Sequence, residues 1–156
     1  MILTPRYRLN SAMDPDVHQT VAARLRAAAQ RYTANRRALV EALSDAGHPL
    51  TIHELLAVRR DVPQSSAYRT LAILEQVGVV RRVVTNEEFT RFELDEELTE
   101  HHHHLICSNC GAVDDVSIAS ELERSVERAL SRVARRTGFT AVSHRLDLMG
   151  TCRNCA

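Results

Sequence analysis

Two Cys-x-x-Cys pairs constrain the folding of this chain more than any other feature of its sequence. One pair is Cys107 and Cys110, the other is Cys152 and Cys155, and the chain has no further cysteine. Four thiolates are the ligand set that a tetrahedral structural zinc prefers. A shared zinc would return the end of the chain to the first pair, so the two pairs predict a subdomain that is closed by metal.

A run of four histidines, His101 to His104, leads into the first pair through Leu105 and Ile106. The apolar continuation favours an extended run, in which side chains alternate between two faces. His101 and His103 would then point one way, and His102 and His104 the other. The run predicts two histidine pairs for two metal sites, an arrangement that a helix would not give. Its internal position argues against an expression tag.

The composition is that of a folded protein. Hydrophobic residues make up 44% of the 156 positions, which suits one domain or two small ones. No apolar run approaches the roughly 18 residues of a membrane span, and the N-terminus lacks the apolar stretch of a signal peptide. We therefore expect a cytoplasmic protein without a membrane partner. In that reducing compartment, paired cysteines favour metal binding over disulfides.

The net charge of zero conceals a split between the two halves of the chain. Residues 1–85 hold 12 Arg against 7 acidic residues, a balance of +5, and the remainder holds 8 Arg against 13, a balance of −5. A basic half suits a polyanion, and an acidic half suits bound cations. Chance asymmetry is the alternative explanation.

Helix signals dominate the first third of the chain. Asp14-Pro15 is a start signal, with the Asp as N-cap, for a helix that runs to about Arg31. A second helix is expected over residues 35–44. Thr51 and Glu54 have the spacing of a capping box, which predicts a short third helix.

The segment after Pro63 bears most directly on function. Its apolar residues recur at helical spacing on one face, and they are Ala67, Leu71, Leu74 and Val77. Two β-rich runs follow, Val79 to Thr85 and Phe89 to Leu94, joined by a turn at 86–88. Three helices and a hairpin form the winged helix-turn-helix order, in which the last helix enters the DNA major groove. Ordinary α+β domains share this order, so the pattern alone fits either a DNA-binding winged helix or an α+β domain with another role.

The C-terminal half mixes strands with one long helix. A strand is expected at 113–117, followed by a helix that ends before Gly138 and has its apolar residues on one face. A last strand over 139–149 alternates Val142, His144, Leu146 and Leu148 on one side and leads to Cys152. The predicted fold class is therefore α+β.

These motifs, taken together, resemble the ferric uptake regulator (Fur) family of bacterial metal-dependent repressors. The resemblance covers roughly residues 15–156, and the motifs occur in family order. It rests on three segments: Ser65-Ser66-Ala67-Tyr68-Arg69-Thr70-Leu71 with Leu74-Glu75, the histidine run joined to Cys107-x-x-Cys110-Gly111, and His144 ahead of Gly150-x-Cys152-x-x-Cys155.

The resemblance implies a domain plan and an assembly. A winged helix-turn-helix DNA-binding domain, residues 1–94, would precede an α/β dimerisation domain with structural zinc, residues 95–156. The homodimer would bind a palindromic double-stranded DNA operator when it is loaded with its sensing metal. It would act on no small-molecule substrate and would not be an enzyme.

By similarity, the DNA-binding residues lie on the last helix of the first domain or before the second. They are Arg31, Ser65, Ser66, Tyr68 and Arg69. An arginine can form bidentate contacts to guanine, and a tyrosine ring can pack on a thymine methyl, so the residue types suit these roles. An aromatic at the edge of the core is the alternative role for Tyr68.

The resemblance also implies three metal sites. The structural zinc site would use the four cysteines, Cys107, Cys110, Cys152 and Cys155. The sensing site would use His48, Glu93, His102 and His104, with His53 as a rival of His48 because the segment between them is one residue longer than in the family pattern. The third site would use His101, His103, Glu123 and His144. Ser120 and Glu123 also have capping-box spacing, which would place this glutamate without a metal.

The sensed metal is harder to predict, because imidazole and carboxylate ligands accept Fe(II), Mn(II) or Zn(II). All four cysteines are committed to the structural site, which favours iron over zinc, with manganese possible. Peroxide-sensing relatives have Asp at the position of Glu93, so that role is a less favoured alternative. A second alternative function is that of a constitutive zinc-stabilised DNA-binding protein that senses no metal. A zinc hydrolase is disfavoured, because four thiolates close the site and no His-Glu-x-x-His occurs.

Overall fold

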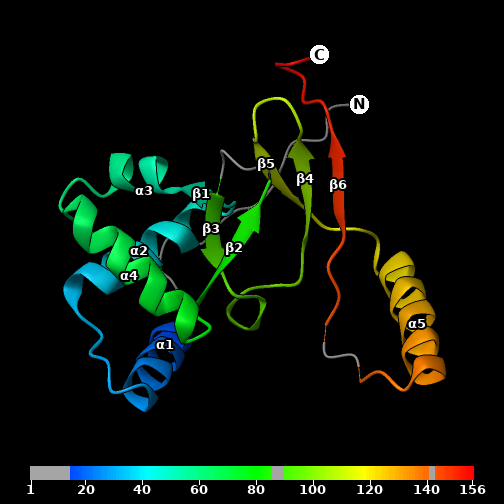
Figure 1. Cartoon of the computed structure of the whole chain (residues 1–156), viewed down its shortest axis with the longest axis horizontal. Coiled ribbons are helices and arrows are strands. Elements are labelled where there is room, and N and C mark those ends of the chain that lie inside the picture. The colour runs from blue at the N-terminus through cyan, green and yellow to red at the C-terminus, as the bar shows by residue number, and fades with distance from the viewer. Residues whose placement is uncertain (1–14, 86–89, 141–142) are drawn as a thin grey trace. The chain divides into compact units, whose positions relative to one another are not determined.

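The computed structural model describes residues 15–85, 90–140 and 143–156 (Figure 1). The chain divides into two compact units, Met1–Glu100 and His101–Ala156. The segment after β3 belongs to the first unit, because Asp95 N–H donates to the Val79 carbonyl at 3.0 Å and Leu98 packs against the core of that unit.

The first unit begins with helices α1 (Pro15–Ala27) and α2 (Ala34–Ala46). The helix expected to reach Arg31 ends earlier, because Ala29 takes a left-handed conformation with φ of 55°. The expected N-cap at Asp14 lies outside the described residues. Thr33 caps α2, and Gly47 ends it in the left-handed region.

The strand β1 (Leu50–Thr51) leads directly into helix α3 (Ile52–Val58). The predicted capping box is confirmed: the Thr51 side chain accepts from Glu54 N–H, and the Glu54 carboxylate accepts from Thr51 N–H at 2.7 Å. That carboxylate also accepts from Arg91 at 2.8 Å, so the start of α3 is tied to the sheet.

Helix α4 (Gln64–Gln76) follows Pro63 as predicted, with its apolar face inward. Ala67, Leu71 and Leu74 are at most 1% exposed, whereas Arg69 on the opposite face is exposed. The predicted amphipathic pattern is therefore confirmed.

A small antiparallel sheet completes the first unit. Strands β2 (Val80–Val84) and β3 (Thr90–Leu94) form the expected hairpin, and β1 pairs with the other edge of β3, for an order of β1-β3-β2. The register pairs Arg81 with Glu93. The expected turn at 86–88 lies outside the described residues. Helices followed by this hairpin make the first unit a winged helix-turn-helix, as predicted.

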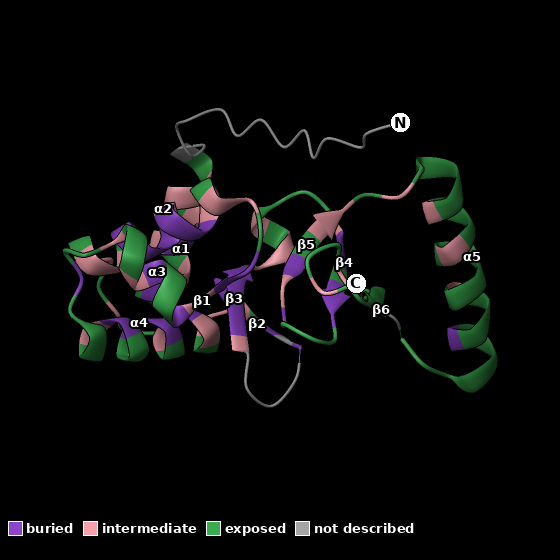
Figure 2. Ribbon diagram, turned by 90° about the horizontal axis from the view of Figure 1, so that it is seen from above, coloured by how far each residue is buried: buried purple, intermediate pink, exposed green. Residues whose placement is uncertain are grey.

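The core of the first unit lies between its helices and the sheet. Figure 2 shows buried positions gathered on the inward sides of α1 to α4. The largest fully buried side chains of this core include Leu25, Leu39, Leu55, Leu71 and Leu74. Their contributions to one cluster explain why four short helices, each marginal alone, form a stable unit.

The second unit is a three-stranded sheet with one helix. The elements are β4 (His103–Cys107), β5 (Val113–Val116), α5 (Ser120–Thr137) and β6 (Asp147–Gly150). The strand order is β5-β4-β6, with β4 antiparallel to β5 and parallel to β6. Together, the two units confirm the predicted α+β class.

The last strand is shorter than predicted. Of the span 139–149, only residues from Asp147 onward form β6, and Val142 lies outside the described residues. The pairing of β6 begins opposite His104, next to the first residue of β4. The Leu146 carbonyl still accepts from His104 N–H at 3.4 Å, so the contact with β4 starts one residue before the strand is assigned.

Helix α5 stands apart from the sheet of its own unit in both views (Figures 1 and 2). Its predicted apolar residues share one face, but Leu122, Leu130 and Val133 are 55%, 42% and 58% exposed. Only Ala134 of this helix is buried. Among the described residues, none of the helices has the length and apolar character that a bilayer crossing requires.

We expect Leu39→Ala to destabilise the first unit by about 2–5 kcal/mol, because Leu39 is fully buried and its truncation leaves a cavity. The matched control is Val58→Ala, since Val58 is 64% exposed and loses little packing. Urea unfolding followed by circular dichroism checks this. Equal midpoints for the two variants would contradict the assignment of Leu39 to the core.

Candidate metal centres

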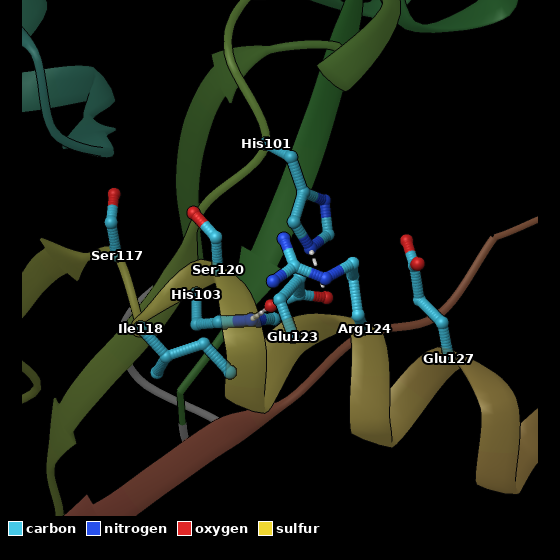
Figure 3. Close-up of a pocket in the computed structure, with 8 residues that line it drawn as sticks. All are labelled: His101, His103, Ser117, Ile118, Ser120, Glu123, Arg124 and Glu127. Carbon is cyan, nitrogen blue, oxygen red and sulfur yellow. Dashed lines mark hydrogen bonds and ion pairs between the residues drawn. The ribbon is translucent and has the colours of Figure 1, made fainter.

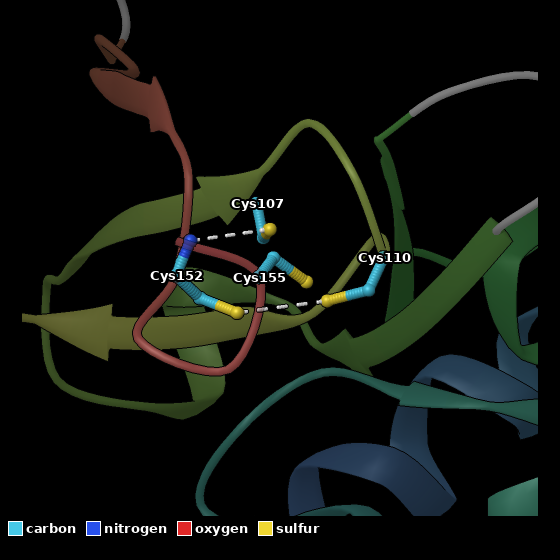
Figure 4. A group of neighbouring side chains, drawn as sticks. All are labelled: Cys107, Cys110, Cys152 and Cys155. Atoms are coloured by element: carbon cyan, nitrogen blue, oxygen red, sulfur yellow. Dashed lines mark hydrogen bonds between the residues drawn. The ribbon is translucent and has the colours of Figure 1, made fainter.

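The four cysteines come together at one end of the second unit (Figure 4). The first pair closes β4, and the second follows β6, which is parallel to β4 and delivers its end to the same edge. Their sulfurs lie within 4.8 Å of one another, with 3.8 Å between Cys110 Sγ and Cys152 Sγ. This separation excludes a disulfide, which has an S–S distance of about 2.05 Å.

The sulfur spacing fits a single tetrahedral zinc. Two sulfurs that each lie about 2.3 Å from zinc at a tetrahedral angle are about 3.8 Å apart. Thiolate sulfurs also bind zinc in preference to calcium or magnesium, which take oxygen ligands. The residues present therefore fit the implied metal.

Backbone amides polarise this group of thiols. Hydrogen bonds from the Cys110 and Cys152 backbone N–H groups lower the pKa of the Cys107 thiol to about 6. Hydrogen bonds of the Cys155 thiol with Cys110 and Cys152 raise its pKa to about 12. A bound dication would favour the thiolate at all four positions.

A second group gathers on one face of β4 and the first turn of α5. It contains His101, His103, Glu123 and His144, whose ligand atoms lie within 4.8 Å of one another. The Glu123 carboxylate lies 2.8 Å from both His103 Nε2 and His144 Nε2, and 3.3 Å from His101 Nε2. All four residues expected in the third site are therefore brought together.

The capping box that would have explained Glu123 without a metal is not formed. Ala119 is the N-cap of α5 and makes no side-chain cap. The Glu123 carboxylate faces the histidines instead, and the hydrogen bond with His103, followed by the nearby charge of His101, lowers the pKa of Glu123. Glu123 Oε1 and His144 Nε2 are buried and lie 2.8 Å apart, but the pair does not have hydrogen-bond geometry. A cation that takes one ligand atom from each residue would satisfy both atoms.

A pocket of about 310 Å³ opens beside this group (Figure 3). Three of the ligands, His101, His103 and Glu123, line it together with Arg124 and Glu127 of α5.

A third group lies on the opposite face of β4. Within the second unit it contains His102, His104 and Asp115, whose ligand atoms lie within 4.8 Å of one another. His102 Nε2 is 3.8 Å from Asp115 Oδ2, and His104 Nε2 is 3.8 Å from Asp115 Oδ1. These distances leave space for an ion among two imidazoles and a carboxylate, a donor set that suits Fe(II), Mn(II) or Zn(II).

Asp115 is a candidate ligand that the sequence did not predict. The register pairs His104 with Asp115 across β4 and β5, so their side chains share a face. Asp114, directly before it, is exposed and pairs with Leu105. Side chains alternate along a strand, so either Asp114 or Asp115 would face His102 and His104. The pairing register of β4 with β5 decides that it is Asp115.

The remaining residues expected in the sensing site lie in the first unit. Glu93 is 5% exposed on β3 and forms an ion pair with Arg81, its cross-strand neighbour. His48 is exposed after α2 and its Nδ1 donates to the Ala46 carbonyl at 2.7 Å, whereas His53 is exposed on α3. Within the described part of this unit, no group of three candidate ligands forms around either histidine.

The residues expected to bind DNA are accessible. Tyr68 is 52% exposed on α4, and Ser65 and Arg69 are exposed on the same helix. Ser66 is half-buried, and Arg31 is exposed in the loop before α2. The exposure of Tyr68 argues against an aromatic at the edge of the core.

Comparisons with known proteins agree with this architecture. Residues 27–149 match the model of the ferric uptake regulator family. The ferric uptake regulation protein of Bordetella parapertussis is 35% identical over 101 residues, 65% of this chain and 68% of that protein. The peroxide-responsive repressor PerR of Staphylococcus aureus is 27% identical over 150 residues, 92% of this chain and 94% of that protein.

A solved structure extends the comparison to the fold. The ferric uptake regulator of Vibrio cholerae matches with a TM-score of 0.63 and 27% identity, over 82% of this chain and 96% of that one. The family model spans most of the present chain and includes the winged helix, the histidine run and the first cysteine pair. This chain belongs to the ferric uptake regulator family.

Proposed function

We propose that this chain is a metal-responsive transcriptional repressor that binds a palindromic operator as a homodimer when it is loaded with a divalent metal. One observation carries the proposal: the two faces of β4 present separate groups of histidine and carboxylate ligands, and a third group of four thiols follows the same strand. A protein stabilised by one zinc alone would need only the thiols.

The three groups would have different roles. The four thiols would hold a structural zinc, because their site is closed by four protein ligands. His102, His104 and Asp115 would form the core of the sensing site, and we keep Glu93 and His48 as its further proposed ligands from the first unit, with His53 as the rival of His48. His101, His103, Glu123 and His144 would form the third site.

Iron is the proposed sensed metal, with zinc next and manganese possible. All four cysteines lie in the thiol group, so the sensing site would have only nitrogen and oxygen donors, which suit Fe(II). The two named relatives differ in what their names say they respond to, iron uptake in one and peroxide in the other. The glutamate at position 93, in place of the aspartate of peroxide-sensing relatives, supports iron.

The regulatory step would be a shift between arrangements of the two units. Bound metal would supply a positive charge that ligands from both units share. An arrangement that brings those ligands together would bind the metal more tightly than the other arrangements. Metal binding would therefore favour it by the difference between these binding free energies. His102 and His104 would bind the metal through Nε2, and α4 would carry Tyr68 and Arg69 to the operator.

The exposed face of α5 supports the homodimer. Leu122, Leu130 and Val133 would leave a continuous apolar stripe in water, which monomeric proteins usually avoid. A second copy of the same helix is a self-complementary partner in a twofold dimer, and a twofold dimer matches a palindromic operator.

We expect Cys152→Ser to abolish the tightly held zinc, about one per chain, because three thiolates no longer close the site. Metal analysis after dialysis against a chelator checks this. The control is Ser108→Ala, an exposed change beside the cysteine knuckle, the group of four thiols from Cys107, Cys110, Cys152 and Cys155. Unchanged zinc content in Cys152→Ser would contradict a four-thiolate site.

We expect the double replacement of His102 and His104 by Ala to abolish metal-dependent DNA binding, because two of the proposed sensing ligands are lost. The knuckle zinc should remain. Binding to a duplex selected from a randomised pool by the wild-type protein is measured with and without added Fe(II) under anaerobic conditions. Leu105→Ala, an exposed change on the same strand, is the control.

Metal-responsive binding by that double variant would overturn the assignment of the sensing site. DNA affinity of the wild-type protein that does not change on removal of its weakly held metal would favour the constitutive alternative. Single replacements of His48 and His53 identify which of them takes part in sensing.

We expect Arg69→Ala to weaken DNA binding by about 1–3 kcal/mol while the metal content stays intact, since this exposed arginine on α4 would contact a base edge. Fluorescence anisotropy with the selected duplex checks this. Arg153→Ala, an exposed arginine after the last strand, should leave affinity unchanged. Equal losses in the two variants would indicate nonspecific charge attraction and contradict a recognition role.

A further inference from the structure

We propose that Asp147 is a positioning residue that fixes the ring and the tautomer of His104 for metal binding. His104 is 2% exposed, and its Nδ1 lies 3.1 Å from Asp147 Oδ1. A carboxylate can only accept a hydrogen bond, so Nδ1 must carry the proton and donate it. In the neutral imidazole Nε2 then carries no proton and can bind a metal, and it lies 3.8 Å from Asp115 Oδ1.

The backbone holds Asp147 in this place. The parallel pairing of β4 with β6 puts His104 opposite Asp147 in the register. The same pairing is anchored at its far end, where Ser108 N–H donates to the Gly150 carbonyl at 2.8 Å and Cys152 N–H donates to Cys107 Sγ at 3.3 Å. The acceptor of the His104 proton is thus fixed by a strand and by the cysteine knuckle, not by a loop.

The two oxygens of Asp147 face different donors. Oδ1 accepts from His104, and Oδ2 lies 3.6 Å from the guanidinium of Arg145. The side chain is one-third exposed, so the ion pair with Arg145 is screened by water and serves mainly to orient the carboxylate.

The neighbouring histidine shows that this support is specific. His103 is equally buried and lies on the opposite face of β4, yet its Nδ1 has no hydrogen-bond partner within the described residues. A carboxylate therefore lies behind the ring of His104 and not behind that of His103. Carboxylates in this position raise the basicity of a ligating imidazole and fix its orientation, and their loss typically weakens metal binding about 10- to 100-fold.

This inference rests on the proposed sensing role of His102, His104 and Asp115, and the experiment separates the two. Full-length, zinc-containing protein is titrated anaerobically with Co(II), and visible absorption reports its binding. The parent and all variants carry Glu123→Gln and His144→Ala, which remove two of the four ligands of the third group, so that the signal comes mainly from the face of His104.

We expect Asp147→Asn to weaken Co(II) binding about 10- to 100-fold, because the asparagine amide can donate to Nδ1 and drive the proton to Nε2. Asp114→Asn, the same change at an exposed position on β5, should leave the affinity unchanged. The knuckle zinc content should stay the same in both. Long-range ¹H–¹⁵N spectra of the zinc-containing protein without Co(II) should show the His104 proton on Nδ1 in the parent and in Asp114→Asn, but not in Asp147→Asn.

Parent-like Co(II) affinity in Asp147→Asn, or a parent His104 that is protonated on Nε2, would overturn the positioning role. Asp115→Asn and His102→Ala test the site itself. If these two variants bind Co(II) as the parent does, the proposed sensing site fails. If they bind it weakly while Asp147→Asn does not, only the role of Asp147 fails.

Discussion

The alternation of side chains along β4 is the constraint on which the rest of the metal chemistry depends. Successive residues of a strand face opposite sides, so adjacent histidines cannot share one ion easily. His103 therefore faces Glu123, and His104 faces Asp115. The same strand ends at Cys107, which places the thiol group beyond both. One short strand thus separates three ligand groups that a helix would have merged.

Local signals in the sequence predicted local structure well. The capping box at Thr51, the amphipathic pattern of α4 and the end of α5 at Gly138 all depend on neighbouring residues, and the structure has all three. What the sequence could not supply was register and the length of a partner strand. Asp115 and Asp147 face His104 because of strand pairing, and the pairing with β4 is assigned only from Asp147 onward.

The sequence also could not predict which surface covers the apolar face of α5. The apolar stripe of α5 is plain in the sequence, but periodicity does not say what covers it. Leu122 and Val133 remain exposed in the isolated chain, which fits a helix that packs against a second copy. A second copy on this face is the homodimer proposed above, whereas the choice of metal depends on a few ligand types that several cations accept.

The most direct test of the central claim, that alternation along β4 separates the metal sites, is anomalous X-ray diffraction from crystals soaked in Mn(II) and measured also at the zinc edge. We expect a zinc peak among the four sulfurs and a distinct manganese peak bounded by His102, His104 and Asp115. A single peak shared by His103 and His104, or manganese density absent from the face of His104, would contradict it.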